Sequence, residues 1–264
     1  MNIFIRELKA NLKSLLIWCF IITLLIIIAV AKFSAFAGDP SMLAILDTLP
    51  PSVLEAMNLR AFNLTTISGF YGVMFIYFSL MGAIAAALWG SDSISKEERD
   101  KTVEFSLVLP VSRSKVITAK ALAALVNCIA FVLITWAVSL IAVQSYNPDK
   151  VFYDFLILEM QAMFLIELIF LAVGLMLGCV MKNYKNAGSS AVAVILVTYF
   201  MSVISGMDQK LDFLKYITPF KYVDAGILFR TGKIDSVYLL LSGLILVVCM
   251  IAAYLVYNKR DLYI

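Results

Sequence analysis

Six long apolar stretches, separated by short charged loops, constrain this chain more than any other feature of its sequence. They span residues 14–37, 67–90, 114–142, 155–181, 188–206 and 236–257. About 20 mostly apolar residues are enough to cross the hydrocarbon core of a bilayer, and a soluble domain has no use for six such segments. The sequence therefore predicts an all-α, polytopic membrane protein in which residues 1–264 form a single transmembrane domain.

Composition supports the membrane assignment and argues against several classes of function. Hydrophobic residues make up 62% of the chain and charged residues 15%. The net charge of +3 gives no support to nucleic-acid binding, and the lack of histidine removes the usual general base and metal ligand. The cysteines lie in four different apolar stretches, which favours small buried side chains over disulfides or ligands. We therefore expect no catalytic residue, cofactor or metal on this chain.

The N-terminal segment resembles a signal peptide in outline but is too long for one. Arg6, Lys9 and Lys13 precede an apolar run over 14–31, and the small-residue pattern Ala-Phe-Ala follows at 35–37. The apolar core of a signal peptide is usually only about 7–15 residues long. We therefore predict a retained first span, preceded by an amphipathic helix that carries the three bases.

Lysine and arginine are distributed unevenly over the loops, which predicts the orientation of the chain. If the N-terminus is cytoplasmic, 13 of the 21 bases lie inside and 8 outside. Cytoplasmic loops carry the excess of positive charge in membrane proteins, so we expect both termini inside the cell membrane, most simply a bacterial plasma membrane. The loop over 207–235 argues the other way, since it holds five of the outside bases.

Two outside loops are predicted to contain short helices. Residues 42–49 are apolar enough to lie on the membrane surface, and a capping-box pattern at 52–55 opens a second short helix. The segment 216–229 is also apolar enough to dip into the membrane as a re-entrant or interfacial helix, where irregular backbone is tolerated only beside protein or water.

The loop between the second and third spans carries the most specific pattern. The sequence Ser-Lys-Glu-Glu at 95–98 matches a capping box, so we predict a helix from Ser95 to about residue 107. Pro110 ends this helix, and Ser112 caps the next one. Five acids and five bases balance over 91–118, and an apolar turn follows the helix. This composition suits docking onto another protein; the alternative is a solvated loop that only maintains topology.

Three stretches resemble type-two ABC transporter permeases. The first joins residues 98–104 (ERDKTVE), 107–113 (LVLPVSR) and Lys120, the second is 216–224 (YITPFKYVD) and the third is 257–261 (YNKRD). The layout of a basic amphipathic N-terminus followed by six spans is also similar to that family.

The resemblance implies the permease subunit of an ATP-driven exporter. A separate ABC ATPase subunit would bind ATP and Mg, and a second permease subunit, identical or paralogous, would complete the pathway. The chain agrees in having no G-x-x-x-x-G-K-[ST] phosphate loop of its own. The ATPase would contact the loop through a set of charged and apolar residues, namely Lys96, Glu97, Glu98, Arg99, Lys101, Glu104, Phe105, Leu107, Pro110 and Arg113.

Glu159 and Glu167 are the acidic residues inside the fourth span, and their spacing of eight places them near one helical face. Intramembrane acids usually face protein or water. They form either a polar site for a cation or proton, or a structural pair in which Glu159 reaches the interface and Glu167 is protonated or hydrogen-bonded.

Two other functions remain open on the sequence alone. An ion-coupled secondary transporter would use the acids of the fourth span, although the two halves show no obvious internal repeat. A membrane sensor or immunity protein that transports nothing would share the same layout.

Overall fold

The computed structural model describes residues 3–37, 50, 54, 59–99, 111–181, 183–207 and 209–259. The regular elements of these residues are all helical, and six helices are long and apolar enough to cross a membrane. They are α1 (Ile3–Phe33), α4 (Ile67–Arg99), α6 (Arg113–Val143), α7 (Lys150–Val180), α8 (Tyr184–Ser205) and α11 (Ser236–Lys259). The predicted all-α polytopic fold is therefore confirmed.

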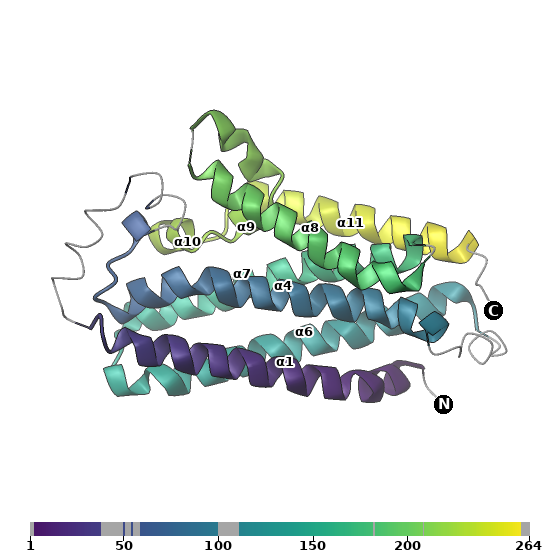
Figure 1. Cartoon of the computed structure of the whole chain (residues 1–264), viewed down its shortest axis with the longest axis horizontal. Helices are drawn as coiled ribbons and strands as arrows, with labels where there is room; N and C mark the ends of the chain where they lie inside the picture. The colour runs from purple at the N-terminus through teal and green to yellow at the C-terminus, as the bar shows by residue number, and fades with distance from the viewer. Residues whose placement is uncertain are drawn as a thin grey trace.

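The long helices run side by side along the long axis of the molecule (Figure 1). The beginning of α1 and the end of α11 lie at the same end, which we call the terminal end. The end of α4 and the beginnings of α6 and α8 lie there too. The opposite end holds the short helices η3 (Gln209–Tyr216), α9 (Pro219–Tyr222) and α10 (Ala225–Thr231). Two further turns of 3-10 helix, η1 (Leu59–Ala61) and η2 (Gln144–Tyr146), flank α4 and α6.

Two helix boundaries at the terminal end differ from the prediction. The amphipathic N-terminal segment and the first span form one helix, α1, which begins at Ile3 rather than near residue 14. The predicted helix start at Ser95 is wrong, because α4 continues without interruption from Ile67 to Arg99. The Ser95 hydroxyl donates to the carbonyl of Ser91 inside α4 (2.8 Å) and caps nothing. Charged helix formers follow Ser95, so no residue before Arg99 stops the helix.

The other predicted helix boundaries are either confirmed or lie outside the described residues. Ser112 caps α6 as expected, since its hydroxyl accepts a hydrogen bond from the backbone N–H of Lys115 (3.4 Å). Three other predictions concern residues outside the described ranges. They are the surface helix at 42–49, the capping box at 52–55, of which only Leu54 is described, and the helix stop at Pro110.

The centre of the bundle is formed by α4 and α7, which approach each other closely through small residues. A Cβ added to Gly174 would lie 2.2 Å from the carbonyl oxygen of Ala87, and one added to Gly178 would lie 2.8 Å from that of Ser91. Gly174 and Gly178 therefore allow the two helices to pack closely. In the most apolar stretch of α4 and of α7, 61% of residues are buried, against 28%, 22% and 17% in α1, α8 and α11.

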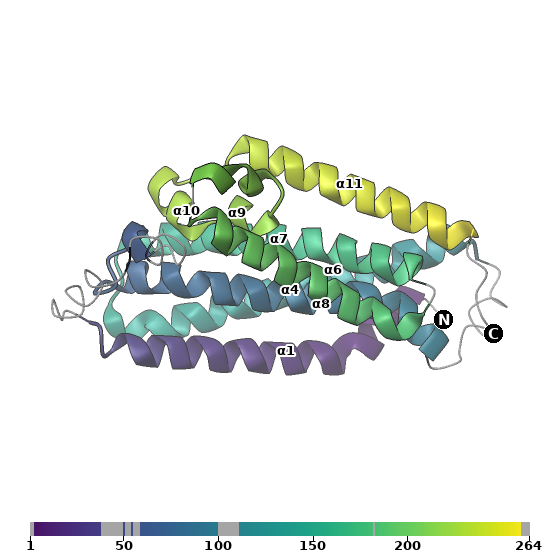
Figure 2. The same ribbon diagram turned by 45° about the horizontal axis from the view of Figure 1, so that its top comes forward.

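The segment over 207–235 folds back on the opposite end of the bundle (Figure 2). Phe220 and Leu228 are buried, with α9 and α10 packed against α4, α7 and α8. Tyr222 stacks on Tyr238 of α11 at a centroid distance of 5.1 Å and donates its hydroxyl to the carbonyl of Tyr216. Burial raises the pKa of Tyr222. The predicted single short helix is thus a pair of short helices supported by protein.

Candidate functional site

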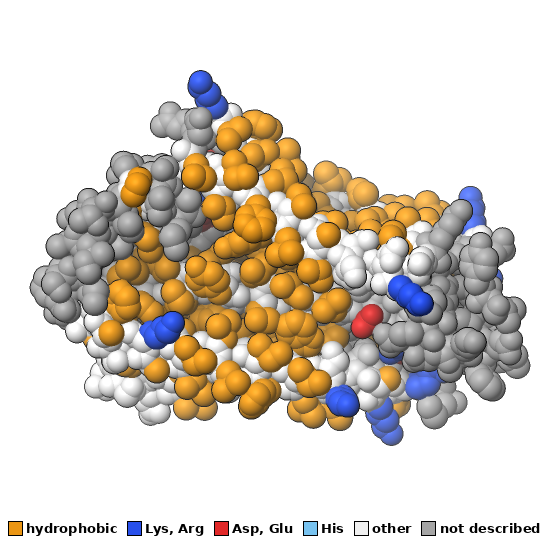
Figure 3. Space-filling model, viewed as in Figure 1, with side chains coloured by type: hydrophobic (Ala, Val, Ile, Leu, Met, Phe, Trp, Pro, Cys, Tyr) orange, Lys and Arg blue, Asp and Glu red, His pale blue; other side chains and the backbone are white. Residues whose placement is uncertain are grey.

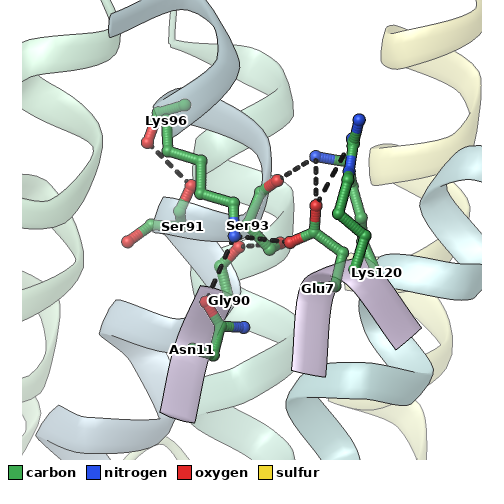
Figure 4. Close-up of polar contacts among 9 residues, drawn as sticks. Glu7, Asn11, Gly90, Ser91, Ser93, Lys96 and Lys120 are labelled. Atoms are coloured by element: carbon green, nitrogen blue, oxygen red, sulfur yellow. Dashed lines mark hydrogen bonds and ion pairs between the residues drawn. The ribbon is translucent and has the colours of Figure 1, made fainter. Parts of the chain in front are cut away.

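A cluster of charged and polar side chains lies buried at the terminal end, where α1, α4 and α6 meet (Figure 4). We call it the charge cluster. It comprises Glu7 and Asn11 from α1, Ser93 and Lys96 from α4, and Lys120 from α6. Glu7 is 2% exposed and Lys120 is fully buried. Buried charges of this kind persist only when they are paired, so the contacts within the cluster matter.

One carboxylate links the three helices. Oε2 of Glu7 lies 2.5 Å from Nζ of Lys96, and Oε1 lies 3.7 Å from Nζ of Lys120. Lys96 also donates to Oδ1 of Asn11 (3.2 Å), and Lys120 donates to the carbonyl of Ser93. Removing a single partner from such a network would leave the other charges buried without compensation.

A second polar contact extends the seam between α1 and α4. Nε1 of Trp89 donates to the hydroxyl of Ser14 (3.1 Å). Glu7, Asn11 and Ser14 follow the spacing of one helical face on α1 and meet α4 residues in antiparallel order. The polar stripe therefore fixes how the first half of α1 sits on α4.

The charge cluster changes the interpretation of the loop residues predicted to contact an ATPase. The Lys96 side chain points into the bundle and is only 15% exposed, so its ammonium group is held by Glu7. The side chains of Glu97, Glu98 and Arg99 belong to the last turn of α4 but are not described. The remaining predicted contacts up to Pro110 lie outside the described residues, namely Lys101, Glu104, Phe105, Leu107 and Pro110 itself.

Arg113, the last predicted contact, holds the end of α11. Its Nη1 donates to the carbonyls of Tyr257 (3.2 Å) and Asn258 (3.4 Å). Thr118 and Tyr254 also share a hydrogen bond between α6 and α11 (2.6 Å). The start of α6 is thereby tied to the C-terminal end of α11, where cations and carbonyls pair favourably.

Sequence reasoning missed Glu7, Asn11 and the buried position of Lys120. A signal was present: Glu7 is an acid within an otherwise basic N-terminal segment, and Asn11 follows it by four residues on the same helical face. The lysine partners lie about 90 and 110 residues further along the chain, so only the tertiary structure brings them together.

Glu159 and Glu167 lie on the inner face of α7, and both are fully buried. The alternative in which Glu159 reaches the membrane interface is therefore wrong. Oε1 of Glu167 would lie 2.7 Å from a Cβ built on Gly82, so the small residue of α4 makes room for the carboxyl. The thiol of Cys128 on α6 lies beside it. Glu159 lies near Tyr71, whose hydroxyl pairs with that of Ser139 at 2.5 Å.

Unlike Glu7, the two α7 carboxyls have no counter-ion among the described residues. Within the described part of the chain, neither oxygen of Glu159 nor of Glu167 has a hydrogen-bond partner of ordinary geometry; the weak donor Cys128 is the nearest approach. A charge in the middle of a transmembrane helix costs about 2.5–3.5 kcal/mol on insertion scales. A neutral, protonated carboxyl avoids most of that cost.

A third feature is the face shared by α4 and α8, which is hollowed at both ends. At the terminal end a pocket is lined by Asp92, Ser95, Lys185 and Ser189 among others. At the opposite end a pocket between α4, α8 and α9 is lined by polar and aromatic residues, including Tyr77, Tyr199, Ser202, Lys221 and Asp224. Lys221 and Asp224 form an ion pair there (3.0 Å).

α8 is also less apolar in sequence than the other weakly buried helices. α1, α8 and α11 are the least buried of the six long helices, yet the most apolar stretch of α8 has a clearly lower mean hydropathy than that of α1 or α11. Lys185, Asn186 and Ser189 are among its exposed residues. These polar residues lie in the first two turns of α8, whereas Val194, Val197 and Phe200 further along the helix are exposed and apolar.

No group of His, Cys, Asp or Glu side chains in the described ranges is arranged to hold a metal ion. The sequence model of the family described as ABC-2 family transporter protein matches residues 1–262 of the chain. No curated protein matches it.

Proposed function

Since the chain belongs to the ABC-2 family of transporter proteins and is a multi-pass membrane transport component, we propose that it is the permease subunit of an ATP-driven exporter. The hydrolysing subunit is a separate chain that binds ATP and Mg. The observation that carries the proposal is the family match over residues 1–262, joined to a sequence with no phosphate-binding loop of its own.

The ATPase docks at the terminal end, on the segment between α4 and α6. Both ends of that segment are anchored: α4 through Lys96 in the charge cluster, and α6 through Lys120 in the cluster and Arg113 on α11. A force applied to the segment therefore acts on α1, α4, α6 and α11 together. Such an arrangement suits the transmission of movement from a docked partner to the spans.

The terminal end faces the cytoplasm. Most of the Lys and Arg side chains visible on one face of the molecule lie toward this end, while hydrophobic side chains cover the middle (Figure 3). The excess of bases agrees with the positive-inside rule and supports an orientation in which both termini lie in the cytoplasm of a cell, most simply a bacterium.

The transport pathway lies along the α4–α8 face and is completed by a second permease subunit. The support is that this face is hollowed, with one pocket lined partly by polar residues toward each end of the bundle. A second subunit covering α8 would shield its polar residues from lipid and enclose both pockets between the two chains.

The test is gentle co-purification of the tagged chain from its own membranes, followed by mass spectrometry and an ATPase assay. We expect a stoichiometric nucleotide-binding subunit. Reversing the charges of Glu97, Glu98 and Glu104 together should weaken its association, whereas Asp212→Lys at the opposite end serves as the matched control and should leave it intact. A chain that purifies alone in several mild detergents would contradict the proposal.

A further inference from the structure

A line of buried polar side chains runs along the inner face of α6. Its members are at most 2% exposed and are Lys120, Asn127, Cys128, Thr135 and Ser139. Their spacing keeps them within one face of the helix, and from the first to the last they extend for about 28 Å at 1.5 Å per residue. A span that only packs against apolar neighbours needs none of these polar groups.

The neighbouring helices add polar groups at matching depths. Lys120 lies in the charge cluster, Cys128 lies beside Glu167, and Ser139 pairs with Tyr71, which in turn lies near Glu159. We call this set, together with Ser79 of α4, the interior column. It extends from the charge cluster into the bundle between α4, α6 and α7.

Several atoms of the interior column lack partners among the described residues. They are Oγ of Ser79, Nδ2 of Asn127 and all four carboxyl oxygens of Glu159 and Glu167. Buried polar groups in proteins are nearly always satisfied, either by protein, by ordered water or by a bound ion or proton. Two unpartnered carboxyls with unpartnered donors along the same column indicate sites that bind protons and water.

We propose that the interior column is a proton-binding site, in which Glu159 and Glu167 are neutral acids that exchange their protons with the terminal end through the charge cluster. Each carboxyl gives its proton to a neighbouring water and takes one up again, so no other reactant is needed. Glu7 and Lys120 stand at the mouth of the column. The proposal requires water in the interval from Lys120 to Asn127, about 10 Å along α6.

The groups that surround the two acids agree with a neutral state. The ionisable side chains that interact with Glu167 are the thiols of Cys128 and Cys19, and Tyr71 interacts with Glu159. In the described ranges, α8, α10 and α11 bring no ionisable group that acts on either carboxyl, although they also pack on α4 or α7. No described residue near the acids supplies the positive charge that an ionised carboxylate needs.

The interior column is separate from the proposed transport pathway. The acids lie on the inner face of α7, whereas the pockets of the α4–α8 face are lined by α4, α8 and the short helices. The inference therefore does not depend on whether an ATPase partner is found. It adds a proton-binding site, whereas the description of the matched family names only transport.

The test is infrared spectroscopy of the purified full chain labelled with carbon-13 glutamate, first in water and then after transfer to heavy water at neutral pH. We expect carbonyl bands of protonated glutamic acid, one lost in Glu167→Gln and another in Glu159→Gln. Asp154→Asn, which removes an exposed carboxyl from the same helix, should leave both bands in place. The bands should shift in heavy water as the acid protons exchange, and Lys120→Met should slow that shift.

The wild-type spectrum alone can overturn the proposal, so it does not depend on every variant folding. If the wild-type chain shows no protonated glutamic acid at neutral pH, the two carboxyls are ionised and the inference fails. If the bands are present but never shift in heavy water, the acids are sealed structural groups and the exchange through the charge cluster is wrong.

Discussion

Glu7 and Glu167 are both buried glutamates of one helical bundle, yet their surroundings are opposite. Glu7, at the terminal end, lies within 4 Å of the ammonium groups of Lys96 and Lys120. Glu167, deep in α7, has no hydrogen-bond partner of ordinary geometry within the described residues and lies beside a glycine and a thiol. The same side chain is therefore paired with two ammonium groups in one place and, among the described residues, has no counter-ion in the other.

The depth of each residue in the bundle explains the difference. Lys96 is three residues from the end of α4, and Lys120 is seven from the start of α6. Lysines near a helix end are tolerated because their long side chains reach toward the water interface, so they can be placed close enough to pair with Glu7. Glu167 is about 17 residues from the start of α7, roughly 25 Å along the helix, where an added lysine would be costly to insert. Of these two buried acids, the one near a helix end is paired with lysines and the one far from the helix ends is not.

The largest effect is expected from Glu7→Gln, which removes the charge that both lysines share. Breaking a buried ion pair from one side costs about 3–5 kcal/mol, because the partner charges stay buried. Thermal unfolding in detergent should show a clear loss of stability. Lys13→Gln, an exposed position on the same helix, is the control and should melt like the wild type. Equal melting of both variants would show that the ion pairs contribute nothing.

A smaller effect is expected from Gly82→Ala, which tests the space beside Glu167. The new Cβ would lie 2.7 Å from Oε1 of Glu167 and 2.9 Å from Cε of Met163. Both atoms end flexible side chains and can move, so we expect a loss of about 1–2 kcal/mol, within the range for modest overpacking. The same melting assay measures it. A variant as stable as wild type would mean that the Glu167 carboxyl is not held in this position.

The smallest effect is expected from Glu167→Gln, because it replaces one neutral group by another of the same shape. The protonated carboxyl and the amide both carry a donor without an ordinary partner, so the stability should change by only about 1 kcal/mol or less. If Glu167 were ionised, the substitution would remove an unpaired buried charge and stabilise the protein strongly. A large rise in melting temperature would thus show that Glu167 is ionised, which contradicts the contrast drawn between Glu7 and Glu167.

The six spans and the capping role of Ser112 followed from the sequence, because span length and helix caps are local properties. The continuous helices α1 and α4 did not, since the pattern at Ser95 fits either a helix start or the interior of a longer helix. Packing of α4 against α1 and α6, with Lys96 turned inward, favours the second possibility. The alternative that places Glu159 at the interface failed for the same reason, because its burial depends on the neighbours of α7.

The sequence by itself determined that this is a six-span membrane protein, that it lacks its own phosphate-binding loop, and that residues such as Glu159 and Glu167 lie within a span. Only the tertiary structure decided which acids are paired. Glu7 meets Lys96 and Lys120 across about 90 and 110 residues of chain, while no lysine approaches Glu167 in the described ranges. Pairing depends on which helices meet at a given depth, and helix packing in a membrane is set by surface shape and small residues rather than by any local pattern.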